Sequence, residues 1–416
     1  MIGAVPTTRE QAQASDAADA LRSCRDRFAL PEGVVYLNGN SLGVLPKETP
    51  GRVGRLVEEQ WGGTLIGAWN KHGWIDLPQR VGARIAALIG AKPHEVLACD
   101  STSVNLFKLI MAAARLRQES GIERPVLLTE SANFHTDIYI ADGAARLAGL
   151  RMDVVPRGDV EQRIGADTNL LLLTHVHFKT AERFDMAAIT ARARNAGTMT
   201  IWDLSHSVGA VPLALNRDGA ELAVGCGYKF LNGGPGAPAF LYVAEHLQEQ
   251  LTTPLQGWMG HRAPFAFTDD YVPGRGLDRF LAGTPPILGL EALDAGLDTF
   301  EGVAMERLWA KSIDLFDLFR GLAEERCPEL VCITPPAPDQ RGSHISFRHP
   351  NAFEICQALI AAGVIGDFRA PDVVRFGITP LYLGHEDVWR AVDQLARILE
   401  SGSWREPRFS VRGKVT

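Results

Sequence analysis

Short, almost purely apolar segments alternate along the chain with longer segments whose apolar residues recur every three to four positions. Apolar runs such as Leu170–Leu173 are typical of strands that are buried on both faces of a parallel sheet. The helical spacing between them predicts helices that cover such a sheet. We therefore predict an α/β fold with a mostly parallel seven-stranded sheet, whose strands are residues 95–100, 125–130, 151–156, 169–176, 198–204, 221–226 and 237–243.

The pattern changes after Glu301, which indicates a smaller C-terminal α+β domain. Three long helical segments (residues 303–326, 353–363 and 386–401) flank two short apolar strands (residues 344–349 and 373–379). At the other end, residues 1–30 have a helical pattern, residues 34–46 form a short strand and a glycine loop, and residues 46–65 form a helix. We expect an N-terminal arm, or part of the small domain, over residues 1–50, a large domain over 51–300 and a small domain over 301–416.

Composition excludes several classes of protein. Hydrophobic residues make up 46% of the 416 positions and charged residues 22%, with a net charge of −7, so the chain lacks the basic face of a general nucleic-acid binder. The six cysteines form no CxxC pair, which fits a reducing compartment better than a disulfide framework. We see no signal peptide and no apolar run of about 18 residues. We expect a cytoplasmic protein without nucleic-acid or membrane partners and without a metal site.

One lysine has an unusual setting. Lys229 lies in the segment GCGYKFLNGGPG (residues 225–236), directly after the predicted strand 221–226. Burial there would disfavour the charged ammonium, and a neutral amine can attack a carbonyl to form a Schiff base. The ordinary alternative is a lysine at a strand end that points into water.

Two further residues favour the first interpretation. Asp203 follows the predicted strand 198–204, and His206 comes three residues later. In open α/β sheets, ligands bind at the carboxyl ends of the strands. A carboxylate there can keep a pyridine nitrogen protonated, as pyridoxal phosphate requires. The alternatives are a helix N-cap for Asp203 and a hydrogen-bonded core histidine for His206.

The phosphate and the ring of such a cofactor need partners too. Thr102 and Ser103 open a predicted helix after a strand, where free amides and hydroxyls form an anion site. Phe134 follows another strand and could stack on the ring, with Asp137 close by. Simple N-capping and a core phenylalanine explain these residues equally well when each is taken alone.

Together these segments resemble kynureninase, a family of fold-type-I pyridoxal-phosphate enzymes. The resemblance covers nearly the whole chain in family order, and YKFLNGGPG and RFGITPLY are its most specific motifs. The matching segments are YLNGNSLG (36–43), SVNLFK (103–108), NFHTDIYIADG (133–143), LTHVHFKT (173–180), IWDLSHSVGAVP (201–212), GCGYKFLNGGPG (225–236), GWMGH (257–261), GTPPI (283–287), RGSHISFRHP (341–350) and GVIGDFRAPDVVRFGITPLY (363–382).

The resemblance implies a role for each matching residue. Lys229 would bind the cofactor covalently, Asp203 would pair with its pyridine nitrogen beside His206, and Tyr228 would contact the phosphate or donate a proton. The remaining cofactor contacts would be Thr102, Ser103, Phe134, Asp137 and Thr174, with Trp258 and Thr284 from a neighbouring subunit. Substrate would be bound by Arg375 at its α-carboxylate, by Trp69 at its aryl end, and by Asn40 and Ser41.

The implied reaction belongs to tryptophan catabolism and NAD biosynthesis. It is the hydrolysis of the Cβ–Cγ bond of L-kynurenine to anthranilate and L-alanine by a homodimer with active sites at the subunit interface. Thr284 and Trp69 follow the bacterial pattern, which favours kynurenine over 3-hydroxykynurenine. Four residues depart from the usual motifs: Asn38 replaces Asp, and His177, Phe178 and Ala181 replace Asn, Tyr and Gly.

Two rival interpretations make different demands. A cysteine desulfurase-like lyase would need a mobile cysteine over the cofactor, and Cys356 is the best-placed candidate, although its apolar helical surroundings are typical of a core residue. A non-catalytic nucleotide-binding protein would need a phosphate-binding loop, and LNGGPG lacks the GxxxxGK[ST] pattern.

Overall fold

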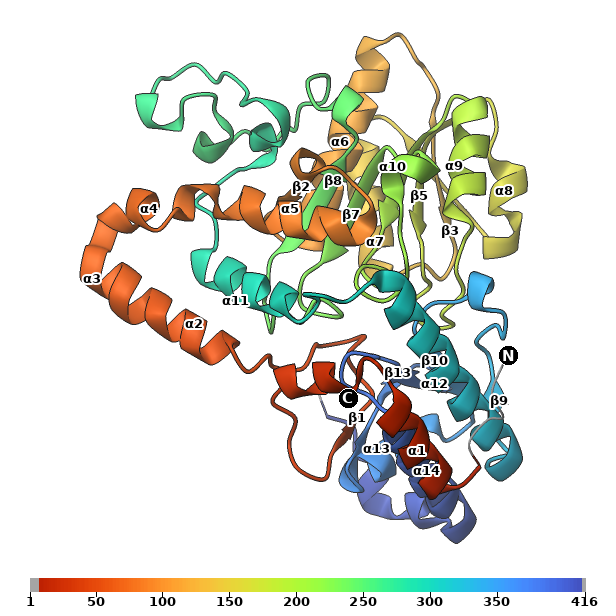
Figure 1. Ribbon diagram of the computed structural model, residues 1–416. Coiled ribbons are helices and arrows are strands. Elements are labelled where there is room, and N and C mark those ends of the chain that lie inside the picture. Colours follow the sequence, from red (N-terminus) through yellow and green to blue (C-terminus); the bar gives the residue numbers. More distant parts are fainter. Residues whose placement is uncertain (1–6, 414–416) are drawn as a thin grey trace.

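The computed structural model describes residues 7–413, and a seven-stranded sheet lies at the centre of its larger domain (Figure 1). The strand order is β2-β8-β7-β6-β5-β3-β4. In this sheet β8 runs antiparallel to β2 and β7, and the other neighbouring strands are parallel. The predicted α/β class is confirmed, with strands β2 (Val96–Ala98), β3 (Val126–Glu130), β4 (Arg151–Val155), β5 (Thr168–Thr174), β6 (Met199–Asp203), β7 (Leu222–Cys226) and β8 (Ala239–Val243).

Helices cover both faces of this sheet, which explains why its strands are continuously apolar. Leu170 and Leu172 of β5 pack in one buried cluster with residues of α6 (Thr102–Glu119) and α7 (His135–Leu147). Leu171 and Leu173 point to the opposite face and pack in a second cluster with α5 (Leu77–Ile89) and α9 (Met186–Asn195). Successive side chains of a strand face opposite ways, so a strand covered on both sides has no polar alternation.

The smaller C-terminal domain contains a four-stranded antiparallel sheet in the order β12-β13-β10-β9. Its strands are β9 (Val331–Cys332), β10 (His344–Arg348), β12 (Asp367–Arg369) and β13 (Val373–Gly377), and its helices are α12 (Met305–Arg326), α13 (Ala352–Ala361) and α14 (His385–Ser401). β12 and β13 pair so that Asp367 lies opposite Arg375. This pairing brings two charged residues of the GDFRAPDVVRFG segment together.

The N-terminal segment packs on this smaller domain. Helix α1 (Arg9–Ala18) contacts α14, and β1 (Val35–Tyr36) pairs in parallel with β11 (Val364–Ile365). The helical pattern predicted over residues 1–30 is too long, because α1 ends at Ala18 and only a short 3₁₀ helix follows over Arg22–Arg27. Residues 1–6 of the predicted arm and residues 414–416 of the predicted small domain lie outside the described residues.

A helical arm extends from the body between β1 and α5 (Figure 1). The helix predicted over residues 46–65 forms as α2 (Thr49–Arg55), a wider helical turn (Leu56–Trp61) and α3 (Gly62–Thr64). After a further turn, α4 (Ala68–Lys71) leads back toward α5. The arm carries exposed apolar side chains, including Ile66, which is 82% exposed.

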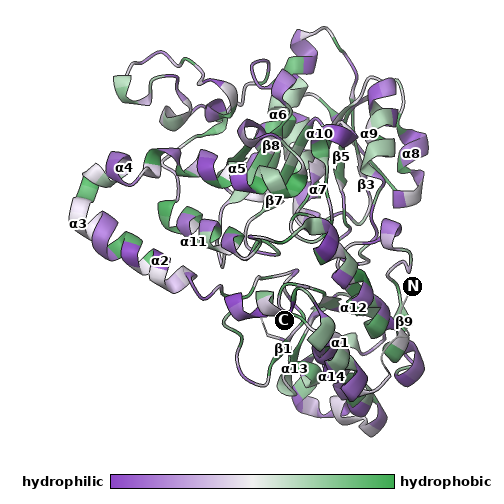
Figure 2. Cartoon of the chain, viewed as in Figure 1, coloured by the Kyte–Doolittle hydropathy of each residue, from purple (hydrophilic) through white to green (hydrophobic). Residues whose placement is uncertain are grey.

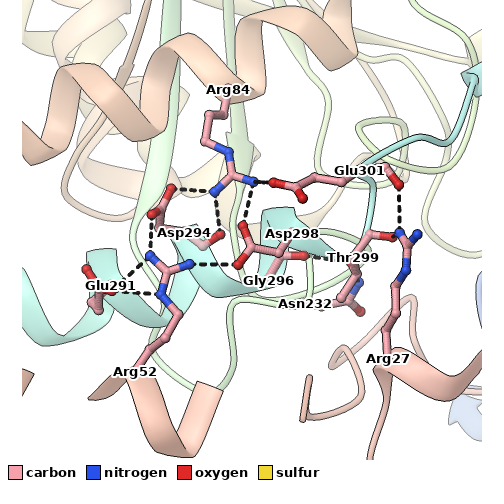
Figure 3. Close-up of polar contacts among 10 residues, drawn as sticks. All are labelled: Arg27, Arg52, Arg84, Asn232, Glu291, Asp294, Gly296, Asp298, Thr299 and Glu301. Carbon is pink, nitrogen blue, oxygen red and sulfur yellow. Dashed lines mark hydrogen bonds and ion pairs between the residues drawn. The ribbon is translucent and has the colours of Figure 1, made fainter. Parts of the chain in front are cut away.

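An ion-pair network anchors the base of this arm to α11 (Ile287–Asp298) (Figure 3). Asp294 accepts from Arg52 of α2 at 2.5 Å and from Arg84 of α5 at 2.7 Å. The side chain of Asp294 is only 8% exposed, so these contacts are largely shielded from solvent. Both arginines also contact Asp298 at 2.7 Å. The network therefore joins α2, α5 and α11.

Hydropathy follows this architecture. Figure 2 shows hydrophobic residues concentrated in the strands of the large sheet and hydrophilic residues over outer helices such as α8 (Val160–Arg163). The short helix α10 (Leu215–Asp218) connects β6 to β7. Within residues 7–413, no helix has both the length and the apolar character needed to cross a membrane.

Candidate active site

A cavity of about 230 Å³ opens at the carboxyl ends of β5, β6 and β7, where a parallel sheet of this kind binds its ligands. It also meets the N-terminal ends of α6 and α7, so loops and helix starts supply most of its wall. Nine of the eleven predicted cofactor contacts line it. The lining residues are Ser101, Thr102, Ser103, Phe134, Thr136, Asp137, Thr174, Phe178, Asp203, Ser205, His206, Tyr228 and Lys229.

Lys229 lies in this cavity with its amine largely shielded. The residue is 8% exposed, and Nζ lies 3.0 Å from His206 Nε2. Nζ also lies 5.7 Å from the ring centroids of both Phe134 and Tyr228. Among the described residues Lys229 forms no salt bridge, so its closest polar partner is an imidazole.

Two buried carboxylates face the same space. Asp203 ends β6, and its Oδ1 accepts a hydrogen bond from the backbone N–H of Ser205 at 2.6 Å. Asp137 lies in the first turn of α7, and burial together with the nearby charge of Asp203 raises its pKa well above its ordinary value. Thr174 Oγ1 lies 3.4 Å from Asp137 Oδ2 and donates to Asn133 Oδ1. Asp137 therefore holds a proton more readily than an ordinary carboxyl group.

The N-terminus of α6 provides an anion-binding end. Ser101 caps the helix, because its hydroxyl accepts from the backbone N–H of Val104 at 3.3 Å. Thr102 and Ser103 then form the first turn, where backbone N–H groups have no partner inside the helix. The helix is 18 residues long, so its dipole favours a negative charge at this end. Both Thr102 and Ser103 line the cavity.

These residues fit pyridoxal phosphate. The cavity offers a shielded amine for the aldehyde, the Asp203 carboxylate for the pyridine nitrogen, and a helix N-terminus for the phosphate. Phe134 lines the wall between them and can cover one ring face. The buried Nδ1 of His206 has no hydrogen-bond partner among the described residues, which leaves one polar atom for a ligand.

The predicted substrate residues Arg375, Asn40 and Ser41 come together beside this cavity. Arg375 is 1% exposed and donates to Asp367 through Nε at 2.8 Å and Nη2 at 2.5 Å. Its Nη2 also contacts Ser41 Oγ at 2.9 Å. With its amide oxygen turned toward the guanidinium, Asn40 accepts from Nε at 2.9 Å.

Sequence reasoning missed Asp367 and Arg369 in this cluster. Arg369 Nη2 lies 2.7 Å from Asp367 Oδ2 and 3.0 Å from Ser41 Oγ. The signal was the spacing of Asp367 and Arg369, which puts both on one face of a short strand. Without the cross-strand register to Arg375, that spacing did not reveal the cluster.

Three further predicted residues, Trp258, Thr284 and Trp69, lie neither in the cavity lining nor in the Arg375 cluster. Trp258 is 40% exposed and packs edge-on against Phe265, with ring centroids 5.7 Å apart. Thr284 is exposed in the loop before α11. Trp69 lies in α4 of the arm and packs against Trp74 with centroids 6.0 Å apart. Within one described chain, the predicted contacts of these three residues with cofactor or substrate are therefore not formed.

Three of the four departures from the family motif lie in one segment after β5, residues 177–181, and one of them lines the cavity. Phe178 lines the cavity and packs edge-on against Phe134 with centroids 5.4 Å apart. His177 Nε2 bonds the backbone carbonyl of Ala132 at 2.7 Å, and burial lowers the pKa of His177 to about 4. Ala181 has a φ of 64°, a conformation that glycine adopts more easily. Asn38 lies in the loop after β1 and does not line the cavity.

Solved structures resemble this chain in fold. A cysteine desulfurase from Thermococcus onnurineus NA1 matches with a TM-score of 0.78 at 18% identity, over 91% of this chain and 98% of that one. A C-DES variant with glycine covalently linked to its PLP cofactor matches with a TM-score of 0.77 at 18% identity, over 89% and 98%. The fold and the site together define a fold-type-I pyridoxal-phosphate-dependent enzyme.

Sequence comparison gives the family within this class. The chain is 47% identical to a kynureninase of Pseudomonas fluorescens over 416 residues, covering 99% of this chain and 100% of that protein. It is 46% identical to a kynureninase of Burkholderia mallei strain SAVP1, over 98% and 100%. The family model for the kynureninase C-terminal domain matches residues 308–395. The chain belongs to the kynureninase family.

This membership confirms several predictions made from the sequence. The protein is an enzyme, a hydrolase of carbon–carbon bonds that uses pyridoxal phosphate and acts on a small molecule. The predicted family and reaction are favoured over the lyase and nucleotide-binding alternatives.

Proposed function

We propose that this chain hydrolyses the Cβ–Cγ bond of L-kynurenine to give anthranilate and L-alanine, with Lys229 as its central catalytic residue. The observation that carries the proposal is the shielded amine of Lys229 facing Asp203 and Thr174 in one cavity, in a chain matched along its whole length to kynureninases. We infer the roles of individual residues from the cavity lining and from the family resemblance.

We assign the cofactor contacts to the residues that line the cavity. Lys229 would hold the cofactor aldehyde, Asp203 its pyridine nitrogen, and Phe134 one face of its ring. Thr102 and Ser103 at the start of α6 would hold the phosphate. When bound, pyridoxal phosphate withdraws electrons from the bonds at the substrate α-carbon.

Lys229 then serves as the base of the reaction. Its Nζ would take the proton from the substrate α-carbon and return it to a neighbouring carbon. The neutral imidazole of His206, 3.0 Å from Nζ, offers an acceptor for an N–H of the amine. This contact holds the lone pair of Lys229 in a fixed direction between proton transfers.

Tyr228 has two candidate roles, phosphate contact and proton donation. Burial raises the pKa of its phenol above the ordinary value, so the hydroxyl stays protonated at neutral pH. A protonated hydroxyl can donate to a phosphate oxygen or to the carbon that leaves. A Tyr228→Phe variant with normal cofactor affinity and slow turnover would favour proton donation.

The α-carboxylate of the substrate would bind Arg375, whose planar guanidinium suits bidentate contact with a carboxylate. Asn40 and Ser41, which contact Arg375 in the described chain, would keep the guanidinium in plane. Arg375→Lys should therefore raise KM for kynurenine without loss of the cofactor.

We further propose a homodimer that completes each site with Trp69, Trp258 and Thr284 of the partner subunit. Large apolar side chains are exposed on two segments, the arm and the loop before α11. Their exposed fractions are Trp61 54%, Leu65 65%, Ile66 82%, Phe265 59% and Phe267 77%. Exposed apolar residues gathered in this way favour a protein interface.

Subunit complementation tests this dimer. Lys229→Ala and Trp258→Ala homodimers should each be nearly inactive, whereas mixed dimers would contain one site with both native residues. Activity that rises on mixing supports shared sites, and no rise contradicts them. Ile66→Asp should also yield monomers in sedimentation, whereas Leu147→Asp, at an exposed leucine of α7 (71%), should not.

The main test is turnover by the purified protein. Kynurenine should give fluorescent anthranilate, and we expect a higher kcat/KM than for 3-hydroxykynurenine, because Thr284 and Trp69 follow the bacterial pattern. Lys229→Ala should lower kcat/KM by at least about 1000-fold. Lys92→Ala, at an exposed lysine paired with Glu245, should not change it. Anthranilate formation by Lys229→Ala at the parental rate would refute the assignment.

We also propose that the enzyme works in the cytoplasm. All six cysteines are free, and five of them are buried. Unpaired thiols fit a reducing compartment. Cell fractionation with activity assays tests this location.

A further inference from the structure

Most of the N–H donors of Arg375 have partners inside the protein. A guanidinium has five N–H donors. Nε and Nη2 donate to the two oxygens of Asp367, Nη2 also contacts Ser41, and Nη1 donates to the backbone carbonyl of Phe178. Asn40 adds a further acceptor for Nε and Nη2. At least four of the five donors are therefore in use.

Arg375 is also separated from the cavity. It is 1% exposed and is absent from the residues that line the cavity, whereas Phe178 lines it. A carboxylate in the cavity cannot take the edge of the guanidinium formed by Nε and Nη2 while Asp367 occupies that edge. Bidentate binding of a substrate carboxylate through this edge of Arg375 thus requires Asp367 to give up at least one contact.

Asp367 also contacts a second arginine, Arg369. Arg369 Nη2 lies 2.7 Å from Asp367 Oδ2 and 3.0 Å from Ser41 Oγ. The Nε of Arg369 is buried and has no partner among the described residues, so Arg369 has a donor in reserve. Its side chain is 33% exposed, which gives it more freedom to move than Arg375 at 1%.

The charge of this cluster is not balanced. Two guanidiniums, Arg369 and Arg375, share one carboxylate, Asp367, which gives a net charge of +1 for the three residues. Burial and the positive charge of Arg375 lower the pKa of Arg369. Because Arg375 is buried and Arg369 is only partly exposed, the excess positive charge favours the binding of an anion. A substrate carboxylate that joins the cluster would bring it to two positive and two negative charges, and thus to a net charge of zero.

We propose that Asp367 is a positioning residue. Asp367 pairs with Arg375 until a substrate carboxylate binds Arg375 in its place, and Asp367 then pairs with Arg369 alone. The buried arginine has an anionic partner before and after the exchange. The proposal rests on the proposed function, because it requires an amino-acid substrate whose carboxylate binds Arg375. It adds a residue pair, Asp367 and Arg369, to the determinants of substrate affinity.

The first test removes the arginine that receives Asp367. In Arg369→Gln holoenzyme, Asp367 and Arg375 form a one-to-one pair that is harder to open. We expect KM for kynurenine and the dissociation constant of L-alanine, followed by the absorbance of the bound cofactor, each to rise about 5- to 10-fold with kcat within about 2-fold. Arg348→Gln, at a surface arginine paired with Asp372, is the matched control and should change neither.

The second test has a readout other than activity. Asp367→Asn leaves two arginines without a carboxylate, so the holoenzyme should melt at a lower temperature. Sodium acetate should then restore at least about 3 °C of that loss, relative to sodium chloride at equal ionic strength. Asp372→Asn, which removes a more exposed carboxylate from the same segment, should show neither the loss nor the rescue.

The outcomes separate this inference from the proposed function. Wild-type enzyme that produces no anthranilate refutes the function. If wild-type enzyme is active but Arg369→Gln keeps the parental KM and L-alanine affinity, the exchange is refuted. The exchange is also refuted if acetate raises the melting temperature of Asp367→Asn no more than it raises that of Asp372→Asn. If Asp367→Asn does not fold, the Arg369→Gln titration alone decides.

Discussion

The Nζ atom of Lys229 lies 3.0 Å from the Nε2 atom of His206, and Nδ1 of the same imidazole has no partner among the described residues. Burial, followed by the nearby charge of Lys229, lowers the pKa of His206 well below its ordinary value, so the ring is neutral. An imidazole that accepts through Nε2 carries its proton on Nδ1. His206 thus orients the amine with one nitrogen and offers a donor with the other.

Replacement of His206 by Phe should slow the enzyme without emptying the site. The ring volume stays similar, but the Lys229 amine loses its hydrogen-bond partner. We expect kcat/KM for kynurenine to fall about 10- to 100-fold, because the lost contact involves an ionisable group. His246→Phe, at an exposed histidine after β8, is the control. Unchanged kinetics in His206→Phe would mean that the amine does not depend on this contact.

Stability should decrease as the pH falls below about 6.5. Burial is the main cause that lowers the pKa of His175 to about 3 and the pKa of His177 to about 4. Burial also lowers the pKa values of His206 and His344 well below their usual range. Unfolding exposes these rings at a pKa of about 6.5, so the unfolded chain binds more protons below that pH. Each ring should cost about 1.4 kcal/mol of unfolding free energy per pH unit between about 6.5 and its folded value.

His177→Asn isolates one of these groups. Asn is the residue usual at this position in the family, and it does not titrate. Melting temperatures measured from pH 7.5 to 5.5 should fall less steeply for this variant than for the parent, by the effect of about one proton. Equal slopes for the two proteins would show that the unfolded state does not protonate His177 more than the folded state.

Apolar runs and helix starts in the sequence were enough to predict the large sheet, and nine of the eleven predicted cofactor contacts line one cavity. Leu170–Leu173 indicated a doubly covered strand, and Ser101 to Ser103 indicated the start of α6; both are confirmed. The antiparallel direction of β8 could not be read from its apolar residues, because a buried strand has the same composition in either direction. Pairing across the sheet decides it.

The substrate side of the site was less accessible to sequence reasoning. The cluster that Asp367 and Arg369 form with Arg375 can be recognised only from the strand register that puts Asp367 opposite Arg375. Trp258 lies on the surface of a single chain, and only the family resemblance predicted its contact with a cofactor, because residue patterns within one chain do not show which surface meets a second subunit. Long-range register and assembly are the physical reasons for both gaps.

The network at the base of the arm should contribute strongly to stability (Figure 3). Burial alone would raise the pKa of Asp294, but hydrogen bonds and charge from Arg84 and Arg52 outweigh it and lower the pKa. Asp294→Asn leaves both arginines short of a carboxylate and should reduce the unfolding free energy by about 3 kcal/mol. Glu301→Gln, at a contact of 3.3 Å and 72% exposure, should change it by less than about 0.5 kcal/mol.

Thermal or urea unfolding of both variants checks this contrast, and a similar loss in each would contradict the role of burial. The folded pKa of Asp294 lies below its unfolded value. Its contribution is therefore complete above about pH 4 and is lost as the pH falls through the folded value. At pH 3, Asp294→Asn should differ less from the parent than at pH 7.

Cys356→Ala distinguishes carbon–carbon hydrolysis from the desulfurase chemistry named for the structures of similar fold. Cys356 lies in α13, is 1% exposed and does not line the cavity. Burial raises its pKa to about 12, so it stays a thiol, and a thiol is a poor nucleophile. Cys226 is nearer to Lys229, but it is 2% exposed and burial raises its pKa as well. We expect both Cys356→Ala and Cys226→Ala to form anthranilate within about 3-fold of the parental kcat, and a desulfurase assay with L-cysteine to detect no sulfide. Sulfide release that disappears in Cys356→Ala would instead favour the lyase.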